Sequence, residues 1–463
     1  MLSEAKQLSA YHVRHGTIGS VERNPSNLDS ERLARAVASR LRAAGHHAYL
    51  VGGSVRDLLL GVPPTDFDIS TDARPERLLN LFPGSGTVGA HFGVVLVRDG
   101  AVQVEVATFR SDREYADGRR PTAVDFETDP RADVLRRDFT INGLMMDLET
   151  GEVLDFVGGR RDLESRTLRA IGDPEARFAE DHLRLLRAVR FAARLGFEIA
   201  PETWRAMVRH PASILTVAPE RVRDELERIL IQGSARRGFE LLDASGMLAV
   251  LLPEVAAMKG VAQPPEFHPE GDVWTHTLLL LENLKDASPA LAWAALLHDV
   301  GKPPTFRLAD RIRFDGHAEE GVRLARAILG RLRASRDQIE QVEALVANHM
   351  RFLDVGRMKQ STLKRFLRQP NFDQHLELHR LDCLGSNGHL DGWEFCRRRL
   401  AELGTEQLKP KRLLTGADLI AAGYAPGPRF AQILDAVEDA QLEGRVTTSD
   451  EAIEWVKQRY LVA

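Results

Sequence analysis

The chain has 463 residues, a formal net charge of −5 and 43% hydrophobic residues. Its length exceeds one ordinary hydrophobic core and predicts about three domains. The negative net charge excludes a wholly basic nucleic-acid binder, although a local basic face stays compatible with RNA. The two cysteines, Cys383 and Cys396, show no disulfide framework, and no apolar run reaches the roughly 18 residues of a membrane span. We therefore expect a cytoplasmic protein without a membrane partner.

The first segment, residues 1–28, is polar and mixed, and we expect a weakly ordered extension there. A helical pattern follows and leads to an apolar strand over residues 48–51. Gly52 and Gly53 come directly after this strand and precede a short predicted helix. Glycines let a ligand approach the backbone closely, and the amides at a helix start attract anions. With Arg56 nearby, the segment predicts a phosphate-binding turn.

Two carboxylates, Asp66 and Asp68, follow that turn and flank Phe67. On a strand the two carboxylates would project from one face and the phenyl ring from the other. Paired carboxylates recruit Mg²⁺, and two metal ions about 3.5–4 Å apart stabilise the attacking and leaving oxygens of a phosphoryl displacement. Taken alone, an Asp-x-Asp pair is usually a surface feature, but after a glycine turn it predicts a nucleotidyl-transfer site.

Two alternating strands are predicted on either side of the hairpin signal at residues 98–100. The second strand, residues 102–109, carries Glu105 on one face. Nucleotidyl-transferring polymerases often carry a third acidic group on a neighbouring strand, which makes Glu105 a candidate metal ligand or base. The charged, turn-rich segment from Arg110 to Phe126 predicts a mobile loop next to the site, with an ordinary surface connection as the alternative.

A basic segment then precedes Asn142. Arg136 and Arg137 suit a triphosphate, because guanidinium groups bind phosphate oxygens in pairs. Asp138 together with Asn142 can bond a ribose 2′-hydroxyl, which would select ribonucleotides. A charged surface is the alternative interpretation.

From about residue 160 to residue 231 the pattern is helical and rich in arginine. Glu180, Arg184 and Arg187 are spaced to share one helical face, and Asp181 precedes Arg184 by three residues. Such acid–arginine pairs are usually exposed salt bridges worth a few tenths of a kcal/mol. A basic stripe on an acidic protein also suits a structured RNA, so this region is a candidate RNA-binding face.

In order, these motifs resemble the signature of the class II tRNA nucleotidyltransferase and bacterial poly(A) polymerase family. The resemblance covers roughly residues 45–235. Besides the glycine turn and the Asp pair, it includes the segments Val88–Val95, Glu105–Arg110, Arg136–Leu144, Glu180–Arg184 and Pro219–Glu227.

The resemblance implies roles for several residues. Asp66 and Asp68 would hold Mg²⁺, and the Glu180-Asp181-x-x-Arg184 motif would act as a protein template. Within it, an aspartate acceptor and an arginine fork of donors can read the Watson–Crick edge of C or A and reject G and U. The loop after Arg110 would admit ATP for the last addition, and its full length favours a chain able to add A.

A second constellation of histidine and aspartate residues follows Pro253, in helical surroundings that include Leu297-His-Asp-Val-Gly-Lys302. It resembles the HD phosphohydrolase domain, which holds divalent metal in a helical bundle. Imidazole and carboxylate ligands suit Ni, Mn, Co, Fe or Zn, and a bound metal can generate hydroxide for phosphoester hydrolysis. A tRNA-binding body with idle ligands is the alternative. The candidate ligands are His276, His298, Asp299, His317, His349 and Asp382.

The expected fold class is α+β, with a polymerase-β-type nucleotidyltransferase head followed by an all-α neck, an HD-type body and a tail. The resemblance implies an enzyme that adds CCA to tRNA 3′ ends from CTP and ATP without a nucleic-acid template. The expected ranges are an extension at 1–28, the head at 29–158, the neck with nucleotide template and RNA binding at 159–260, the HD-type domain at 261–390 and the tail at 391–463.

Three alternatives stay open. One is an A-adding enzyme that works with a CC-adding partner, and a second is a poly(A) polymerase. The second is less favoured, because residues 87–94 lack the basic pair before phenylalanine that bacterial poly(A) polymerases tend to show. The third is a metal-dependent HD phosphohydrolase whose head only binds RNA.

Overall fold

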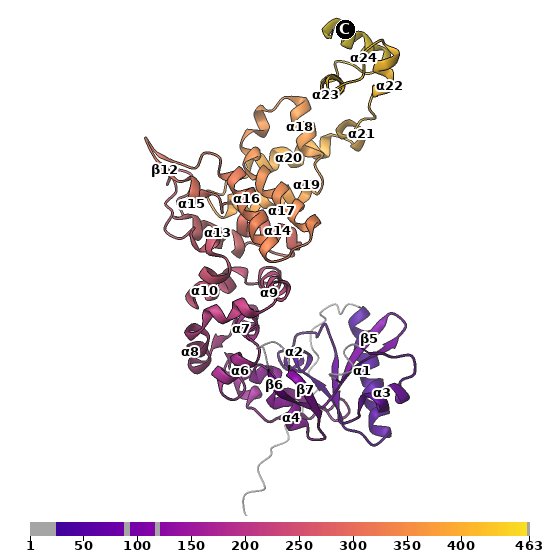
Figure 1. The fold of residues 1–463 in the computed structure, drawn as a ribbon, viewed down its shortest axis with the longest axis vertical. Helices are drawn as coiled ribbons and strands as arrows, with labels where there is room; N and C mark the ends of the chain where they lie inside the picture. Colours follow the sequence, from indigo (N-terminus) through magenta and orange to yellow (C-terminus); the bar gives the residue numbers. More distant parts are fainter. Residues whose placement is uncertain (1–24, 88–92, 116–120, 461–463) are drawn as a thin grey trace, which may run out of the picture. The chain divides into compact units, whose positions relative to one another are not determined.

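The computed structural model describes residues 25–87, 93–115 and 121–460, in which the chain forms two compact units (Figure 1). No helix within these ranges is long and apolar enough to cross a membrane. The expected extension lies mostly outside the described residues, and its last residues instead begin helix α1 (Pro25–Ala43). The first unit comprises residues up to 229 with 240–251, and the second comprises 230–239 with the residues from 252 onward. The five predicted domain ranges are finer than this division and stay a prediction.

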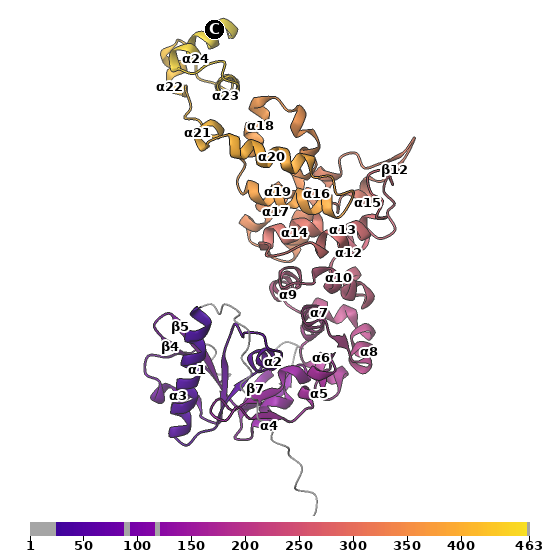
Figure 2. The same ribbon diagram turned by 180° about the vertical axis from the view of Figure 1, so that it is seen from behind.

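A seven-stranded mixed sheet is the basis of the first unit. Helix α1 packs against three of its central strands, and helix α3 (Pro75–Leu81) packs against an outer one (Figure 2). The strand order is β3 (Gly86–Thr87), β4 (Val94–Asp99), β5 (Val102–Thr108), β2 (Asp68–Thr71), β1 (Ala48–Val51), β8 (Leu144–Met146) and β9 (Val153–Asp155).

The register of the central strands brings the predicted site residues to one end of the sheet. Strand β2 pairs antiparallel with β1, so that Asp68 lies opposite Val51, the residue before the glycine turn. It also pairs in parallel with β5, where Asp68 is matched with Glu105. Val104 and Val106 are buried while Glu105 is exposed, as the period-two pattern of a strand predicts. The α+β fold class is thus confirmed.

Two local predictions in the head are wrong. Strand β2 begins only at Asp68, so Asp66 precedes the strand, although Phe67 is buried as expected. The predicted irregular loop after Arg110 is instead largely a hairpin of β6 (Arg110–Tyr115) and β7 (Pro121–Phe126). Cross-strand pairing there satisfies the backbone hydrogen bonds that a loop would leave to water. The turn of this hairpin and part of the predicted family segment at 88–95 lie outside the described residues.

The helical part of the first unit also departs from expectation at the acidic motif. A continuous helix would have placed Glu180 and Arg184 on one face, but the helix breaks between them. Asp181 has φ −147° and ψ 103°, and its Oδ1 accepts the Leu183 N–H at 3.1 Å. Such a local side-chain bond competes with helix continuation. The other helices of this unit are α2 (Gly53–Leu59), α4 (Pro130–Leu135), α5 (Gly159–Glu164), α6 (Pro174–Glu180), α7 (Arg184–Leu195), α8 (Pro201–Arg209), α9 (Pro219–Ile231) and α11 (Met247–Leu251).

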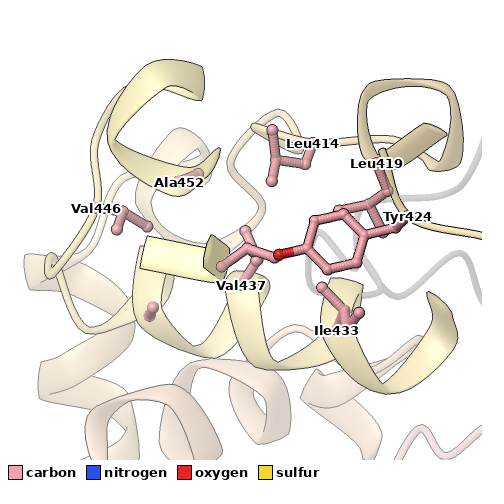
Figure 3. Close-up of a cluster of buried hydrophobic side chains, with 9 residues drawn as sticks. Leu414, Leu419, Tyr424, Ile433, Val437, Val446 and Ala452 are labelled. Atoms are coloured by element: carbon pink, nitrogen blue, oxygen red, sulfur yellow. The ribbon is translucent and has the colours of Figure 1, made fainter. Parts of the chain in front are cut away.

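The second unit is helical apart from one small hairpin, β12 (Arg307–Leu308) and β13 (Ile312–Arg313). Its last segment has a hydrophobic core of its own, in which Tyr424 packs against Leu419, Ile433 and Val437 (Figure 3). Helix α10 (Ala235–Ala244) is divided between the two units at residue 240. The longer helices of the second unit are α13 (Val273–Glu282), α14 (Pro289–Leu297), α16 (His317–Arg331), α17 (Arg336–Asn348), α18 (Gln360–Leu367), α19 (Phe372–Leu384), α20 (Asp391–Glu402), α23 (Arg429–Leu442) and α24 (Ser449–Arg459). The shorter ones are α12 (Pro253–Ala256), α15 (Lys302–Thr305), α21 (Thr405–Leu408) and α22 (Gly416–Ala421).

Candidate active site and metal-ligand cluster

A pocket of about 470 Å³ lies in the first unit, where the glycine turn, the Asp pair and α7 come together. Among the residues predicted for the nucleotide site, only Glu105 and Glu180 do not line it. The predicted residues that line it are Gly52, Gly53, Arg56, Asp66, Asp68, Arg136, Arg137, Asp138, Asn142, Asp181, Arg184 and Arg187.

The carboxylates form the acidic end of this pocket. Burial and the negative charges of Glu105 and Asp66 together raise the pKa of Asp68 to about 6, and the charge of Arg137 opposes them. Three carboxylates lie near one another, and their mutual repulsion makes Asp68 harder to ionise. A divalent cation bound between them would remove this repulsion. These oxygen ligands fit magnesium.

A buried carboxylate that sequence reasoning missed orients the two predicted phosphate-binding arginines. Asp133 is fully buried, and its Oδ1 accepts Arg136 Nη2 at 2.5 Å while its Oδ2 accepts Arg137 Nη2 at 2.9 Å. Although burial opposes ionisation, the two guanidinium groups lower the pKa of Asp133. Its position three and four residues before the arginines on a short helix is the signal that would have identified it.

The glycine turn lies directly against one of these arginines. Gly52 has φ +73°, a conformation that residues with a side chain rarely adopt, and a Cβ added there would lie 3.2 Å from Arg137 Nη1. The glycine is therefore needed both for the backbone turn and for the close approach of the guanidinium.

A chain of charged and polar groups links the glycine helix α2 to α7. Arg56 is buried; its Nε donates to Asp57 at 2.8 Å and its Nη1 donates to Asn142 Oδ1 at 2.8 Å. Asn142 Nδ2 donates to Asp138 Oδ1 at 3.0 Å, and Arg187 Nη2 donates to Asp138 Oδ2 at 2.5 Å. Burial alone would raise the pKa of Asp138. The charge of Arg187 and the hydrogen bonds from Arg187 and Asn142 outweigh burial and lower this pKa to about 2.

The two halves of the predicted template are each held by another side chain. Asp181 Oδ2 accepts Arg221 Nη2 at 2.9 Å, while Arg184 Nη1 donates to Glu180 Oε2 at 2.6 Å. Arg184 also donates from Nη2 to the backbone carbonyl of Arg136 at 2.9 Å. Within the described residues no side-chain hydrogen bond joins Asp181 to Arg184, and both line the pocket.

The six predicted ligands of the second constellation converge in the second unit. They come from different elements: α13 and α16 each carry one histidine, one histidine begins the 3-10 helix after α17, the His-Asp pair follows α14, and α19 carries the distant aspartate. In this order the residues are His276, His317, His349, the pair His298 and Asp299, and Asp382.

These ligands form two groups that meet at Asp299. In one group the Nε2 atoms of His276 and His298 lie 3.2 Å apart, and in the other those of His317 and His349 lie 3.2 Å apart. Asp299 Oδ2 is 3.3 Å from His298 Nε2, and its Oδ1 is 3.8 Å from both His317 and His349 Nε2. One carboxylate thus faces both groups.

The other ring nitrogen of each histidine determines which atom faces the cluster. The Nδ1 atoms of His298, His317 and His349 lie 3.0, 2.9 and 2.6 Å from backbone carbonyl oxygens. The Nδ1 of His276 lies 2.8 Å from the carboxylate of Glu270, a residue that sequence reasoning missed. Because these oxygens only accept, they favour a proton on each Nδ1, and the Nε2 atoms are the ones that face the cluster. Facing lone pairs beside carboxylates fit a divalent metal.

The sheet with its glycine turn and Asp pair defines a nucleotidyltransferase head, which this chain joins to a helical unit with a metal-ligand cluster. Three family models match the chain: "Poly A polymerase head domain" at residues 48–169, "Probable RNA and SrmB- binding site of polymerase A" at 196–259 and "HD domain" at 272–422. The chain belongs to the tRNA nucleotidyltransferase and poly(A) polymerase family, in the subgroup with a C-terminal HD domain.

Relatives of this chain within the family are named for CCA addition. A CCA-adding enzyme of Streptococcus pneumoniae is 32% identical over 91% of this chain and 95% of its own length. A multifunctional CCA protein of Neisseria gonorrhoeae is 40% identical over 69% of this chain and 78% of its own length. A solved structure of the Bacillus stearothermophilus CCA-adding enzyme in complex with CTP is 27% identical, with a TM-score of 0.73, and the match covers 94% of this chain and 98% of that one.

Proposed function

We propose that this protein adds CCA to tRNA 3′ ends from CTP and ATP, without a nucleic-acid template. The observation that carries the proposal is the single pocket in which Asp66 and Asp68 lie with Asp181 and Arg184. Carboxylates for the transfer and an acceptor–donor set for base selection are the two parts that such an enzyme needs. Both cysteines are free and buried, which is compatible with the reducing cytoplasm in which we place the enzyme.

In this proposal each group of pocket residues performs one task. Asp66 and Asp68, with Glu105 beside them, would hold magnesium, and the bound ion would stabilise the attacking and leaving oxygens of the displacement. Arg136 and Arg137 bind the triphosphate in the orientation that Asp133 imposes. The primer 3′-hydroxyl then attacks the α-phosphorus in line, the bond to the β-phosphate breaks, and pyrophosphate leaves.

Base and sugar selection fall to the other wall of the pocket. The carboxylate of Asp181 accepts from the exocyclic amine of C or A, and Arg184 donates to the pocket wall and the base. The Asp138–Asn142 pair lies where it can read the ribose. Because one site serves both nucleotides, the order C, C, A has to come from the growing RNA end that fills the same pocket.

Three tRNA transcripts separate full CCA addition from the A-adding alternative: one ending at the discriminator base, one after C and one after CC. Each is incubated with CTP, with ATP and with both, and the products are read to the nucleotide. We expect the first transcript to gain CCA when both nucleotides are present. Extension of the CC-ended transcript alone would reject the proposal in favour of A addition.

The raised pKa of Asp68 predicts an acid limb in the activity profile. Below about pH 6 this carboxyl is protonated and binds no cation, so kcat/KM for nucleotide addition should fall about tenfold per pH unit. Protons and magnesium compete for the same oxygens, so the midpoint should move to lower pH as magnesium concentration rises. Profiles at two magnesium concentrations measure this, and a midpoint that ignores magnesium would contradict the metal assignment.

Glu105 provides the matched test of that limb. Its negative charge raises the pKa of Asp68, so Glu105→Gln should move the midpoint to lower pH whatever happens to the rate. Glu76→Gln, at an exposed position in α3 of the same head, is the control and should leave the midpoint unchanged. An unmoved midpoint in Glu105→Gln would remove this residue from the site.

A second candidate function rests on the convergent Nε2 atoms of the second unit. We propose that this cluster binds a divalent metal chosen from Ni, Mn, Co, Fe and Zn, and that the second unit hydrolyses phosphoesters such as cyclic phosphates. The ligands fit such a metal because imidazole and carboxylate together suit this group of ions, which supply hydroxide when bound. Lys302 Nζ lies 2.6 Å from Asp299 Oδ2, and its positive charge can stabilise the negative charge of a phosphoester bound at the cluster.

His298→Ala should separate the two activities, because the two units are distinct. Hydrolysis of 2′,3′-cyclic nucleotides, assayed with each metal in turn, should fall about 100-fold or more, while CCA addition stays. Asp66→Ala should give the reverse pattern. A wild-type protein that binds none of these metals and hydrolyses nothing would leave the cluster as a structural core.

A further inference from the structure

The pocket contains an arginine to which the sequence motifs assign no role, although it lies in the family segment Pro219–Glu227. Arg221 lies in the first turn of α9, lines the pocket and donates from Nη2 to Asp181 Oδ2 at 2.9 Å. Its other terminal nitrogen, Nη1, is buried and has no hydrogen-bond partner among the described residues. A buried guanidinium nitrogen without a partner is costly, so a group on the pocket wall in this state points to an acceptor supplied by a ligand.

The contacts of Asp181 show what Arg221 does to it. One carboxylate oxygen accepts the Leu183 N–H at 3.1 Å, and the other accepts Arg221 Nη2. Two anchors, one on each oxygen, hold the carboxylate in one orientation in an extended backbone segment. Without the second anchor the side chain can rotate about the first. The direction in which its acceptor points therefore depends on Arg221.

Arg184 cannot perform the same task. Its guanidinium donates to Glu180 Oε2 and to the backbone carbonyls of Arg177 and Arg136, at 2.6, 2.8 and 2.9 Å. These bonds fix Arg184 to α6 and to the end of α4, and none of them reaches Asp181. The acceptor of the template is thus oriented by a residue outside the Glu-Asp-x-x-Arg motif.

We propose that Arg221 is a specificity-determining residue, which holds the acceptor of Asp181 toward the incoming base and offers Nη1 as a donor beside it. C and A both present an amine donor next to a ring-nitrogen acceptor, which matches an acceptor next to a donor. U and G present a carbonyl acceptor next to an N–H donor, which places like groups against like. This inference rests on the proposed function and adds a residue to its template.

The test compares nucleotide discrimination in three variants of the full chain on a tRNA transcript. Arg221→Met keeps the aliphatic stem and removes every donor, and Arg221→Lys keeps the charge but not the fork. The ratios of kcat/KM for CTP over UTP and for ATP over GTP should fall about tenfold or more in Arg221→Met, and less in Arg221→Lys. Arg223→Met is the control, because Arg223 lies on the same helix and pairs with Asp224 instead.

A structural role alone would give a different result. If Arg221 only supported the fold, kcat/KM would fall equally for all four nucleotides, the ratios would stay constant and the thermal midpoint would drop. Constant ratios in Arg221→Met therefore overturn the inference, whether or not the rate changes. The proposed function fails separately, when the wild-type protein itself adds neither C nor A.

Discussion

The Asp68→Asn variant should lose nucleotide addition by at least about a thousandfold. Asparagine matches the shape of aspartate but is neutral, so the cation loses a charged ligand at the point where the displacement takes place. Loss of several kcal/mol of metal-dependent charge stabilisation converts at about 1.4 kcal/mol per factor of ten. Single-turnover addition of one nucleotide to a transcript measures the effect, and near-normal addition would contradict the role of Asp68.

The same variant should be more stable than the wild type at neutral pH. The folded-state pKa of Asp68, about 6, exceeds the unfolded value of 3.8, so above pH 6 the folded state holds a carboxylate that the unfolded state accommodates more easily. Asparagine removes this cost, which the difference between the two pKa values puts at about 3 kcal/mol. The advantage should disappear as the pH falls below about 4, where both states are protonated. Denaturant unfolding at pH 7 and pH 4 tests the sign.

The Arg187→Met variant should lower the free energy of unfolding by about 3 kcal/mol at pH 7. Asp138 is buried, and its lowered pKa comes chiefly from Arg187, so removing the arginine leaves a buried carboxylate with a lost partner. The stabilisation is present above the ordinary pKa of an aspartate and is lost as the pH falls through about 2. At neutral pH the wild type has this stabilisation in full, so the variant should show the whole decrease in unfolding free energy there.

Two further variants make this measurement specific. Asp138→Asn combined with Arg187→Met should recover part of the stability, because no unpaired charge remains. Arg209→Met is the comparison, because it breaks the ion pair of Arg209 with Glu175 at the surface. The Arg209 side chain is 60% exposed, so this variant should lower the free energy of unfolding by less than about 1 kcal/mol. Equal decreases in unfolding free energy for Arg187→Met and Arg209→Met would show that the Asp138–Arg187 pair stabilises the fold no more than an exposed ion pair does.

Much of the nucleotide site could be predicted because its residues are local in the sequence. The glycines after a short apolar strand and the Asp pair at the start of the next strand keep their relation in the fold, since β1 and β2 are paired neighbours. The period-two pattern of residues 102–109 predicted the face on which Glu105 lies, while its pairing with Asp68 is known only from the fold. Pairing between strands that are consecutive in the chain, such as β1 and β2, carries such patterns directly into three dimensions.

The groups that orient those residues could not be predicted in the same way. The spacing of Asp133 to Arg136 and Arg137 is a signal in the sequence, but only the fold shows that Asp133 and Asp57 are buried against arginines. The helix period predicted one face through Glu180 and Arg184, but the side chain of Asp181 ends the helix with its own hydrogen bond. Arg221 meets Asp181 from a helix 40 residues away, a contact that no spacing rule contains.

The most direct test of this account supplies all four nucleoside triphosphates together to a tRNA transcript that ends at the discriminator base. The 3′ ends of the products are then sequenced. A pocket that selects C or A through Asp181, Arg184 and Arg221 and transfers at Asp66 and Asp68 should yield CCA ends in the wild type and none in Asp68→Asn. Tails of A alone, ends that contain U or G, or an unextended transcript would contradict it.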